Sequence, residues 1–121
     1  MKTMPTSELL DLPAGTVVVV PFPYSDRLAE KRRPAVVVSG AAVAATGYVW
    51  IAMITSARNA QVAGDVPIED VRSAGLSVAS VVRPLKIACI EPTRILRAIG
   101  TLPGNTAAQV YATIRTLIGP A

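Results

Sequence analysis

Residues 17–39 read VVVVPFPYSDRLAEKRRPAVVVS, and the two apolar, β-branched runs in this stretch decide the fold. The runs at residues 17–20 and 35–38 are too short for buried helices and are bounded by Pro and Gly, so both are predicted to be strands. The polar segment between them, residues 23–33, is much longer than the roughly two to five residues that close an ordinary hairpin. Long loops on rigid strands are commonly functional, so this segment is the first candidate site.

Arg33 is the residue of this loop whose direction is most restricted, because Pro34 follows it. A proline disfavours helical geometry at the preceding residue, so Arg33 is expected to be extended. Its guanidinium is a planar fork of donors that matches two phosphate oxygens and stays charged at physiological pH. The consecutive cations Lys31, Arg32 and Arg33 favour a phosphate ligand, and the alternative is a solvated loop charge or a pair with Glu30.

The composition indicates one globular domain with a modest excess of positive charge. The chain has 121 residues, of which 51% are hydrophobic, and this length suits one core but not two. Lys and Arg number 12 against 8 Asp and Glu, and the net charge of +4 favours acidic or polyanionic partners. We therefore expect residues 1–121 to form a single domain, with residues 1–13 as a loose N-terminal lead-in.

Cysteine content and hydropathy favour a cytoplasmic protein. Cys89 is the only cysteine, which excludes an intrachain disulfide and suits a reducing compartment. Its apolar neighbours, Ala88 and Ile90, predict a small buried side chain. Residues 1–15 lack the apolar core of a secretory signal, and no apolar run approaches the ~18 residues that span a bilayer. No membrane association is expected.

Histidine is absent, and its absence excludes several kinds of site. A Ser-His-Asp arrangement and a His-ligated zinc cannot be built, and the usual base at neutral pH is missing. Acidic residues are scattered except for Glu69 and Asp70, which suit a turn as well as a metal, and no glycine-rich phosphate loop occurs. Any catalysis is therefore expected to need neither a metal nor a cofactor.

Short strands separated by turn residues are predicted after Ser39. They lie at residues 48–54, 64–68, 77–82, 85–90 and 95–99, and Thr55 and Ser56 end the first of these. The Ala-rich stretch that leads into this strand suits a helical turn as the alternative.

One amphipathic helix closes the chain. Thr106 and Gln109 fit a capping box at its start, and Gly119 with Pro120 fits its end. Its apolar stripe recurs at spacings of three and four residues: Ala107, Val110, Tyr111, Ile114, Leu117 and Ile118. Many short strands and one terminal helix predict a mainly β (α+β) fold, a small SH3-like β-barrel with a C-terminal α-helix.

The sequence resembles the MazF/PemK toxins of bacterial type II toxin-antitoxin systems over residues 15–119. The matching segments are GTVVVVPFPYSD at 15–26, KRRPAVVVS at 31–39, ITS at 54–56, GDVPI at 64–68 and SVVRPLKI at 80–87. The resemblance implies a dimeric SH3-like barrel that cleaves single-stranded mRNA without a metal. It also implies a cognate antitoxin, which we expect to lay an acidic, apolar segment across the basic loop.

The resemblance places the family's catalytic arginine on Arg33 and its catalytic hydroxyl on Thr55. RNA carries its own nucleophile, the 2′-hydroxyl, so a protein needs only to hold the phosphate, align this hydroxyl and stabilise the developing charge. Arg33 suits charge stabilisation, and Thr55 suits orientation of the phosphate, with an ordinary strand threonine as the alternative. Asp26 and Glu30 are candidates for the base. The sequence departs from the family at Thr16, where an acidic residue is usual, and we expect this change to affect local packing more than catalysis.

Residues near these two are candidates for RNA binding. Tyr24 at the loop mouth is the best placed to stack on a base, whereas Tyr48 and Trp50 are expected in the core or an interface. The remaining candidates are hydroxyl or cationic residues, and each cation is also compatible with a solvated loop charge: Ser25, Arg27, Lys31, Arg32, Ser56 and Arg58.

Two other functions fit the same barrel: a toxin that binds DNA gyrase without cleaving anything, and a plain SH3-like interaction module. The fold does not separate them from a nuclease. The pair of Arg33 and Thr55 favours the nuclease, because a gyrase binder needs no positioned phosphate fork. A homodimer is predicted because the first strand is apolar on both faces, which a small barrel cannot cover alone.

Overall fold

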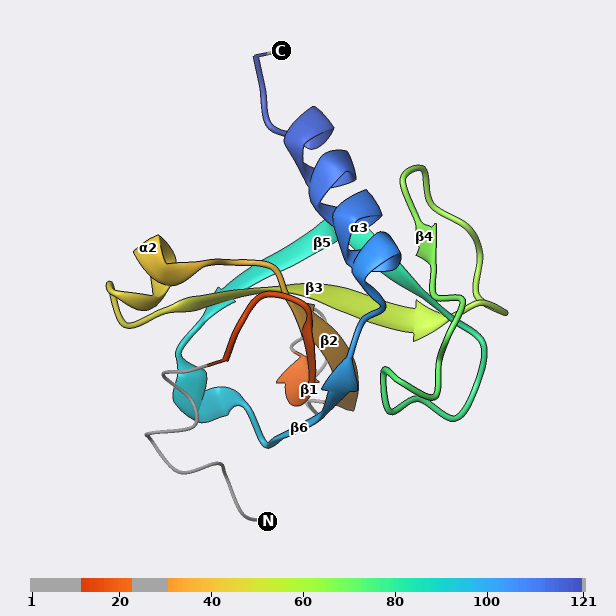
Figure 1. Ribbon diagram of the computed structural model, residues 1–121, viewed down its shortest axis with the longest axis horizontal. Helices are drawn as coiled ribbons and strands as arrows, with labels where there is room; N and C mark the ends of the chain where they lie inside the picture. Colours follow the sequence, from red (N-terminus) through yellow and green to blue (C-terminus); the bar gives the residue numbers. More distant parts are fainter. Residues whose placement is uncertain (1–11, 23–30, 121) are drawn as a thin grey trace.

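The apolar runs of the sequence form an antiparallel sheet in the order β4-β5-β3-β2-β1-β6 (Figure 1). The computed structural model describes residues 12–22 and 31–120. Its elements are β1 (Thr16–Phe22), β2 (Lys31–Val37), α2 (Ala41–Ala44), β3 (Val49–Ser56), β4 (Val66–Pro67), β5 (Ser80–Ile90), η1 (Pro92–Arg94), β6 (Arg97–Thr101) and α3 (Gly104–Leu117).

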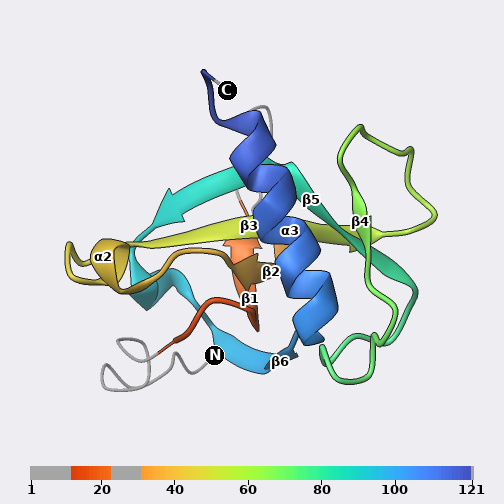
Figure 2. The ribbon, with the colours of Figure 1, turned by 45° about the horizontal axis from the view of Figure 1, so that its top comes forward.

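The sheet is strongly curled into a half-barrel, and α3 lies across one of its faces (Figures 1 and 2). The predicted mainly β fold with a C-terminal helix is thus confirmed. Helix α2 confirms the helical turn that was the alternative for the Ala-rich stretch. No helix among the described residues is long and apolar enough to cross a membrane.

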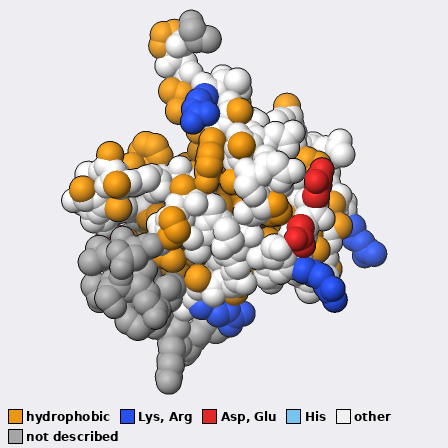
Figure 3. Space-filling view, viewed as in Figure 1, with side chains coloured by type: hydrophobic (Ala, Val, Ile, Leu, Met, Phe, Trp, Pro, Cys, Tyr) orange, Lys and Arg blue, Asp and Glu red, His pale blue; other side chains and the backbone are white. Residues whose placement is uncertain are grey.

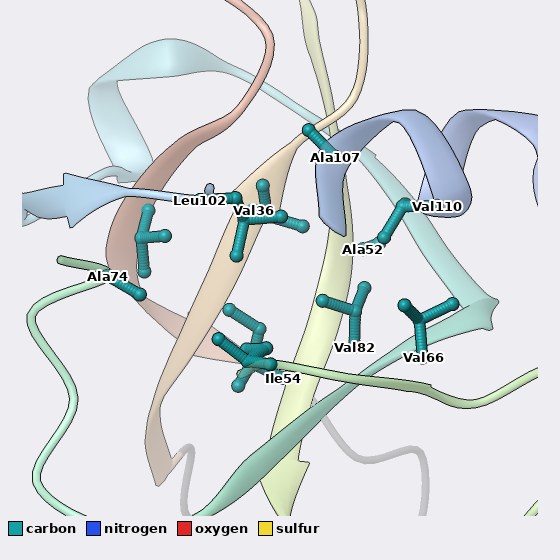
Figure 4. Packing of buried hydrophobic residues seen from close by; sticks show 11 residues of the cluster. Val36, Ala52, Ile54, Val66, Ala74, Val82, Leu102, Ala107 and Val110 are labelled. Atoms are coloured by element: carbon teal, nitrogen blue, oxygen red, sulfur yellow. The ribbon is translucent and has the colours of Figure 1, made fainter. Parts of the chain in front are cut away.

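Alternating side chains of the sheet build two cores, one on each face. The helix-side core contains Val17, Val36, Ala52 and Ile54 from the strands and Val110 from α3 (Figure 4). The far-side core contains the residues between them in the sequence: Val18, Val20, Ala35, Val37, Ile51 and Met53, together with Val49 and Ile95. This period of two explains why the valine runs are apolar throughout, because both faces of the sheet are covered where β1 and β2 lie.

β5 is one continuous strand, so the prediction of two strands on either side of Arg83 and Pro84 is wrong. Met53 of β3 pairs with Arg83 while Ala52 pairs with Ile87, so residues 84–86 form a bulge. Pro84 has no N–H to donate, and a bulge accommodates it without ending the strand.

The start of α3 also differs from the prediction. The helix begins at Gly104, with Pro103 as its N-cap, and no side-chain cap is present. The proposed capping box of Thr106 and Gln109 is therefore wrong, since Thr106 is buried and its backbone N–H donates to the side chain of Asn105 at 2.9 Å. The end at Leu117 agrees with the predicted stop.

Cys89 is exposed, contrary to the predicted buried side chain. It pairs with Trp50 on β3, and Trp50 is itself 42% exposed. Cys89 lies in an extended strand, so its direction is set by the register between β5 and β3. Its apolar neighbours in the sequence do not determine which way it faces.

Gly75 and Gly100 let the turn at residues 70–76 lie directly against β6. Gly75 has φ of +76°, and a Cβ on Gly100 would lie 2.4 Å from the carbonyl carbon of Ala74. A Cβ on Gly75 would likewise meet the carbonyl oxygen of Ile99, and these backbone atoms cannot move aside as the end of a side chain can.

Gly100→Ala is expected to destabilise the protein by about 1 to 3 kcal/mol, because the added methyl overpacks a backbone contact. Urea unfolding monitored by circular dichroism measures this loss. Gly104→Ala is the matched control, since a Cβ there meets nothing within 4 Å. Equal stability of Gly100→Ala and the wild type would contradict the close approach.

Candidate functional site

Arg33 lies inside β2 and not in a loop, because the strand already begins at Lys31. Arg33 pairs with Val20 of β1, and Pro34 pairs with Val19. The backbone of Arg33 is therefore extended, as its position before a proline predicted. The side chain is half-buried and its Nε atom is shielded from solvent. The predicted loop of residues 23–33 is shorter at its C-terminal end than expected, and Arg33 is fixed by a strand.

Thr55 lies near the C-terminal end of β3 and is only 5% exposed. It pairs with Val81 of β5. Its Oγ1 accepts a hydrogen bond from Nδ2 of Asn59, with the two atoms 2.6 Å apart. The hydroxyl is thus held at the rim of the sheet.

Arg33 and Thr55 lie at the same end of the paired strands β2 and β3. β2 and β3 are antiparallel and pair Val37 with Ile51 and Ala35 with Met53. The pairing ends at Ala35 and Met53, and its register extended by two residues would set Arg33 opposite Thr55. Both lie two positions beyond residues of the far-side core, so both belong to that face of the sheet. A guanidinium and a hydroxyl on one face of neighbouring strands are suited to hold one phosphate.

The other predicted RNA contacts fall in different places. Ser56 ends β3, and its Oγ accepts a hydrogen bond from the backbone N–H of the exposed Arg58 at 3.2 Å. Lys31 and Arg32 are exposed in β2. Arg32 alternates with Arg33 along β2, and both line a pocket of about 300 Å³ together with Arg97. Tyr24, Ser25 and Arg27 lie outside the described residues, as do Asp26 and Glu30.

Tyr48 and Trp50 do not lie in the core. Tyr48 is 46% exposed and Trp50 is 42% exposed. Of the two expected locations, the core is therefore wrong, and an interface stays a prediction. Both are far from the end of β3 that carries Thr55, because β3 starts at Val49.

An ion pair that sequence reasoning missed anchors the loop after β3. Nε and Nη2 of Arg83 each donate to a carboxylate oxygen of Asp65 at 3.0 Å, and Nη2 also donates to the carbonyl of Ala60 at 2.8 Å. Both side chains are largely buried, with 13% of Arg83 and 9% of Asp65 exposed. The sequence signals only the extended backbone of Arg83, which precedes Pro84 just as Arg33 precedes Pro34, and not its partner Asp65.

Asp65→Asn is expected to loosen this anchor in a pH-dependent way. The hydrogen bond from Arg83 holds the pKa of the Asp65 carboxyl below its ordinary value of 3.8. A carboxyl group whose pKa is lower in the folded state stabilises the fold at pH values above its unfolded-state pKa. This contribution is lost as the pH falls through its folded-state pKa. At pH 7 the variant should be less stable by about 1.5 to 3 kcal/mol, the usual size for hydrogen bonds to a charged group.

Urea unfolding between about pH 7 and pH 2 measures this difference. The gap between wild type and Asp65→Asn should close as the pH falls below 3.8. A gap that stays constant over the whole range would contradict a stabilising role of the Asp65 charge.

No group of three or more Cys, Asp or Glu side chains that could hold a metal occurs among residues 12–22 and 31–120.

Comparisons with known proteins agree with the fold described above. A family model described as PemK-like, MazF-like toxin of type II toxin-antitoxin system matches residues 14–118. The solved structure of MazF from Deinococcus radiodurans is 26% identical, with a TM-score of 0.69 over 89% of this chain and 96% of that chain. A MazE-MazF complex from the same organism is 26% identical, with a TM-score of 0.66 over 90% and 96%.

The toxin MazF-mt6 of Mycobacterium tuberculosis shares the fold. It is 22% identical, with a TM-score of 0.66 over 84% of this chain and 93% of that chain. A comparison with curated protein sequences gives no significant match.

Proposed function

Because the chain belongs to the PemK-like, MazF-like toxins of type II toxin-antitoxin systems, we propose that it is an endoribonuclease that cleaves single-stranded mRNA without a metal ion. The observation that carries this proposal is the register of β2 and β3, which, extended by two residues, would set Arg33 opposite Thr55 on one face of the sheet. Its site of action would be the cytoplasm, where mRNA is found.

The proposed reaction uses the 2′-hydroxyl of the RNA as the nucleophile. Its oxygen attacks the neighbouring phosphorus, the bond from phosphorus to the 5′-oxygen breaks, and a 2′,3′-cyclic phosphate forms. A base takes the proton of the 2′-hydroxyl, and the leaving 5′-oxygen gains a proton. Negative charge grows on the two non-bridging phosphate oxygens, and the Arg33 guanidinium would stabilise it. Thr55 adds a neutral donor to the same phosphate.

The RNA would run past the rim of the sheet at the ends of β2 and β3. Lys31 and Arg58 are exposed cations at this rim and would contact flanking phosphates, and Ser56 would add a hydroxyl. Arg32 would contact the RNA where the RNA passes to the other face of the sheet. From the sequence alone, Tyr24, Ser25 and Arg27 are proposed as further contacts, with Tyr24 stacking on a base.

A cleavage assay tests the proposal. Purified protein and single-stranded RNA are incubated with a chelator, and cleavage at defined positions is expected. If no RNA of any sequence is cleaved, the nuclease is refuted in favour of a non-cleaving toxin that binds DNA gyrase or a plain interaction module.

We propose that the chain forms a homodimer, although not for the reason that the sequence suggested. β1 needs no partner subunit, because Val17 and Val18 are completely buried within one chain. The apolar side chains that are exposed lie elsewhere: Trp50 and Ile87 are 42% and 41% exposed on the sheet face that α3 crosses, and Leu117 is 46% exposed at the end of α3. Figure 3 shows hydrophobic side chains gathered along α3.

Sedimentation is expected to give roughly twice the chain mass of 12.6 kDa at micromolar concentration. Trp50→Glu should shift the protein toward monomer, because it places a charge in an apolar interface. Val78→Glu is the control, since Val78 is exposed in the turn before β5. A wild type that sediments as a monomer would contradict the dimer.

A cognate antitoxin is the second proposed partner. Solved relatives include a MazE-MazF complex and an endoribonuclease in complex with its cognate antitoxin from Mycobacterial species. The net charge of +4 suits an acidic segment, which would lie across Lys31 and Arg33 and exclude RNA.

A further inference from the structure

We propose that Asn59 is a positioning residue that leaves the hydroxyl proton of Thr55 free to donate to the RNA phosphate. This inference rests on the proposed nuclease function. Its structural basis is the hydrogen bond from Nδ2 of Asn59 to Oγ1 of Thr55, with the two atoms 2.6 Å apart. Asn59 itself lies in the turn directly after β3 and is exposed, so it needs no rearrangement of the core to reach Thr55.

The direction of this hydrogen bond decides what Thr55 can do. A threonine hydroxyl has one proton to donate and two lone pairs that accept. The Asn59 amide donates to one lone pair of the Thr55 oxygen. The proton of the Thr55 hydroxyl takes no part in this hydrogen bond. Among the described parts of the chain, this is the only hydrogen bond that Oγ1 of Thr55 makes.

Other threonines of the chain behave in the opposite way. Thr16, Thr46 and Thr113 donate their hydroxyl protons to backbone carbonyls, at 2.8, 2.6 and 2.9 Å. A hydroxyl bonded in that way has no proton left for a ligand. Thr55 is thus arranged as a donor, whereas these threonines satisfy local carbonyls.

A donor is what the proposed reaction requires at this place. The non-bridging oxygens of a phosphate carry negative charge and only accept hydrogen bonds. Thr55 therefore helps only if its proton points at the phosphate, and such charge-assisted bonds are about twice as strong as neutral ones. Because the Asn59 amide occupies one lone pair, it narrows the directions in which the Thr55 proton can point before the substrate arrives, so less rotation has to be frozen during the reaction.

The loop that carries Asn59 is itself fixed at several points. The backbone N–H of Asn59 donates to the carbonyl of Ser56 at 3.0 Å, which closes a tight turn on the end of β3. The next residue, Ala60, is held by the guanidinium of Arg83 on β5, and Arg83 is held in turn by Asp65. Asn59 therefore presents its amide from a turn that is tied to the sheet on both sides.

Asn59→Asp inverts the hydrogen bond and is the sharpest test. A carboxylate only accepts, so the Thr55 hydroxyl would turn and donate to it, and its proton would be lost to the phosphate. We expect the rate of RNA cleavage to fall by ~10²-fold, as for the loss of one preorganised donor. Asn59→Ala should lose less, ~10-fold, because water replaces the amide without reversing the bond. Gln61→Glu adds the same charge to the same loop as a control and should lose much less than Asn59→Asp.

A double-mutant cycle with Thr55→Val distinguishes a role through Thr55 from a general effect on the loop. If Asn59 acts by orienting Thr55, Asn59→Asp should change the rate by no more than about twofold once the hydroxyl is absent. Melting temperatures of all variants confirm that they are folded. An Asn59→Asp protein as active as the wild type, or effects that simply add in the double mutant, would overturn the inference. If the wild type cleaves no RNA, the proposed function itself fails, which is a separate outcome.

Discussion

Arg33→Ala is expected to lower the rate of RNA cleavage by ~10²- to 10³-fold, the usual effect of removing one preorganised donor to a transition state. Arg33 is fixed in β2 by its pairing with Val20, and its shielded Nε shows that the side chain is partly enclosed by protein. An enclosed guanidinium interacts more strongly with developing charge than one in bulk water. Single-turnover cleavage of a labelled RNA measures the chemical step apart from binding.

Arg33→Lys and Arg32→Ala are the controls for this prediction. A lysine keeps the charge but lacks the planar fork, so only part of the activity should return. Arg32 is the preceding residue and is also cationic, but it is exposed and alternates with Arg33 along β2, so Arg32→Ala should weaken binding more than it slows the chemical step. Arg33→Ala with a wild-type rate would exclude Arg33 from catalysis.

Thr55→Val is expected to slow the chemical step by ~10²-fold with little change in stability. The substitution keeps the β-branched shape that suits a strand and removes only the hydroxyl. The Asn59 amide that loses its acceptor is exposed and can bond to water, so no buried donor is left unsatisfied. Thr55→Ser keeps the hydroxyl and should retain more activity than Thr55→Val. Equal activity of Thr55→Val and wild type in the same single-turnover assay would remove Thr55 from the site.

The sequence predicted the elements whose pattern is local. The runs at residues 17–20 and 35–38 are apolar in every position, and the two cores on either side of β1 and β2 explain this. The position of Arg33 before Pro34 predicted its extended backbone. The terminal helix followed from the spacing of Ala107, Val110 and Ile114.

Features that depend on register could not be predicted in the same way. The bulge at Pro84 keeps β5 continuous, and the register with Trp50 turns Cys89 outward. These outcomes are set by the partner strand, which lies far away in the sequence.

The contacts around the site were hidden for a related reason. Arg83 and Asp65 meet across 18 positions of the chain, and no local pattern joins them. The contact from Asn59 to Thr55 spans only four positions, yet it depends on the tight turn that Ser56 closes. Sequence spacing alone does not show this turn.

Analysis of the cleavage products tests the central claim most directly. The wild-type protein is incubated with a single-stranded RNA in a chelating buffer, and with the same RNA carrying one deoxyribose at the cut position. The proposed mechanism predicts a 2′,3′-cyclic phosphate on the upstream fragment and no cleavage at the deoxyribose. Cleavage at the deoxyribose, or an upstream fragment that ends in a 3′-hydroxyl, would contradict attack by the 2′-hydroxyl.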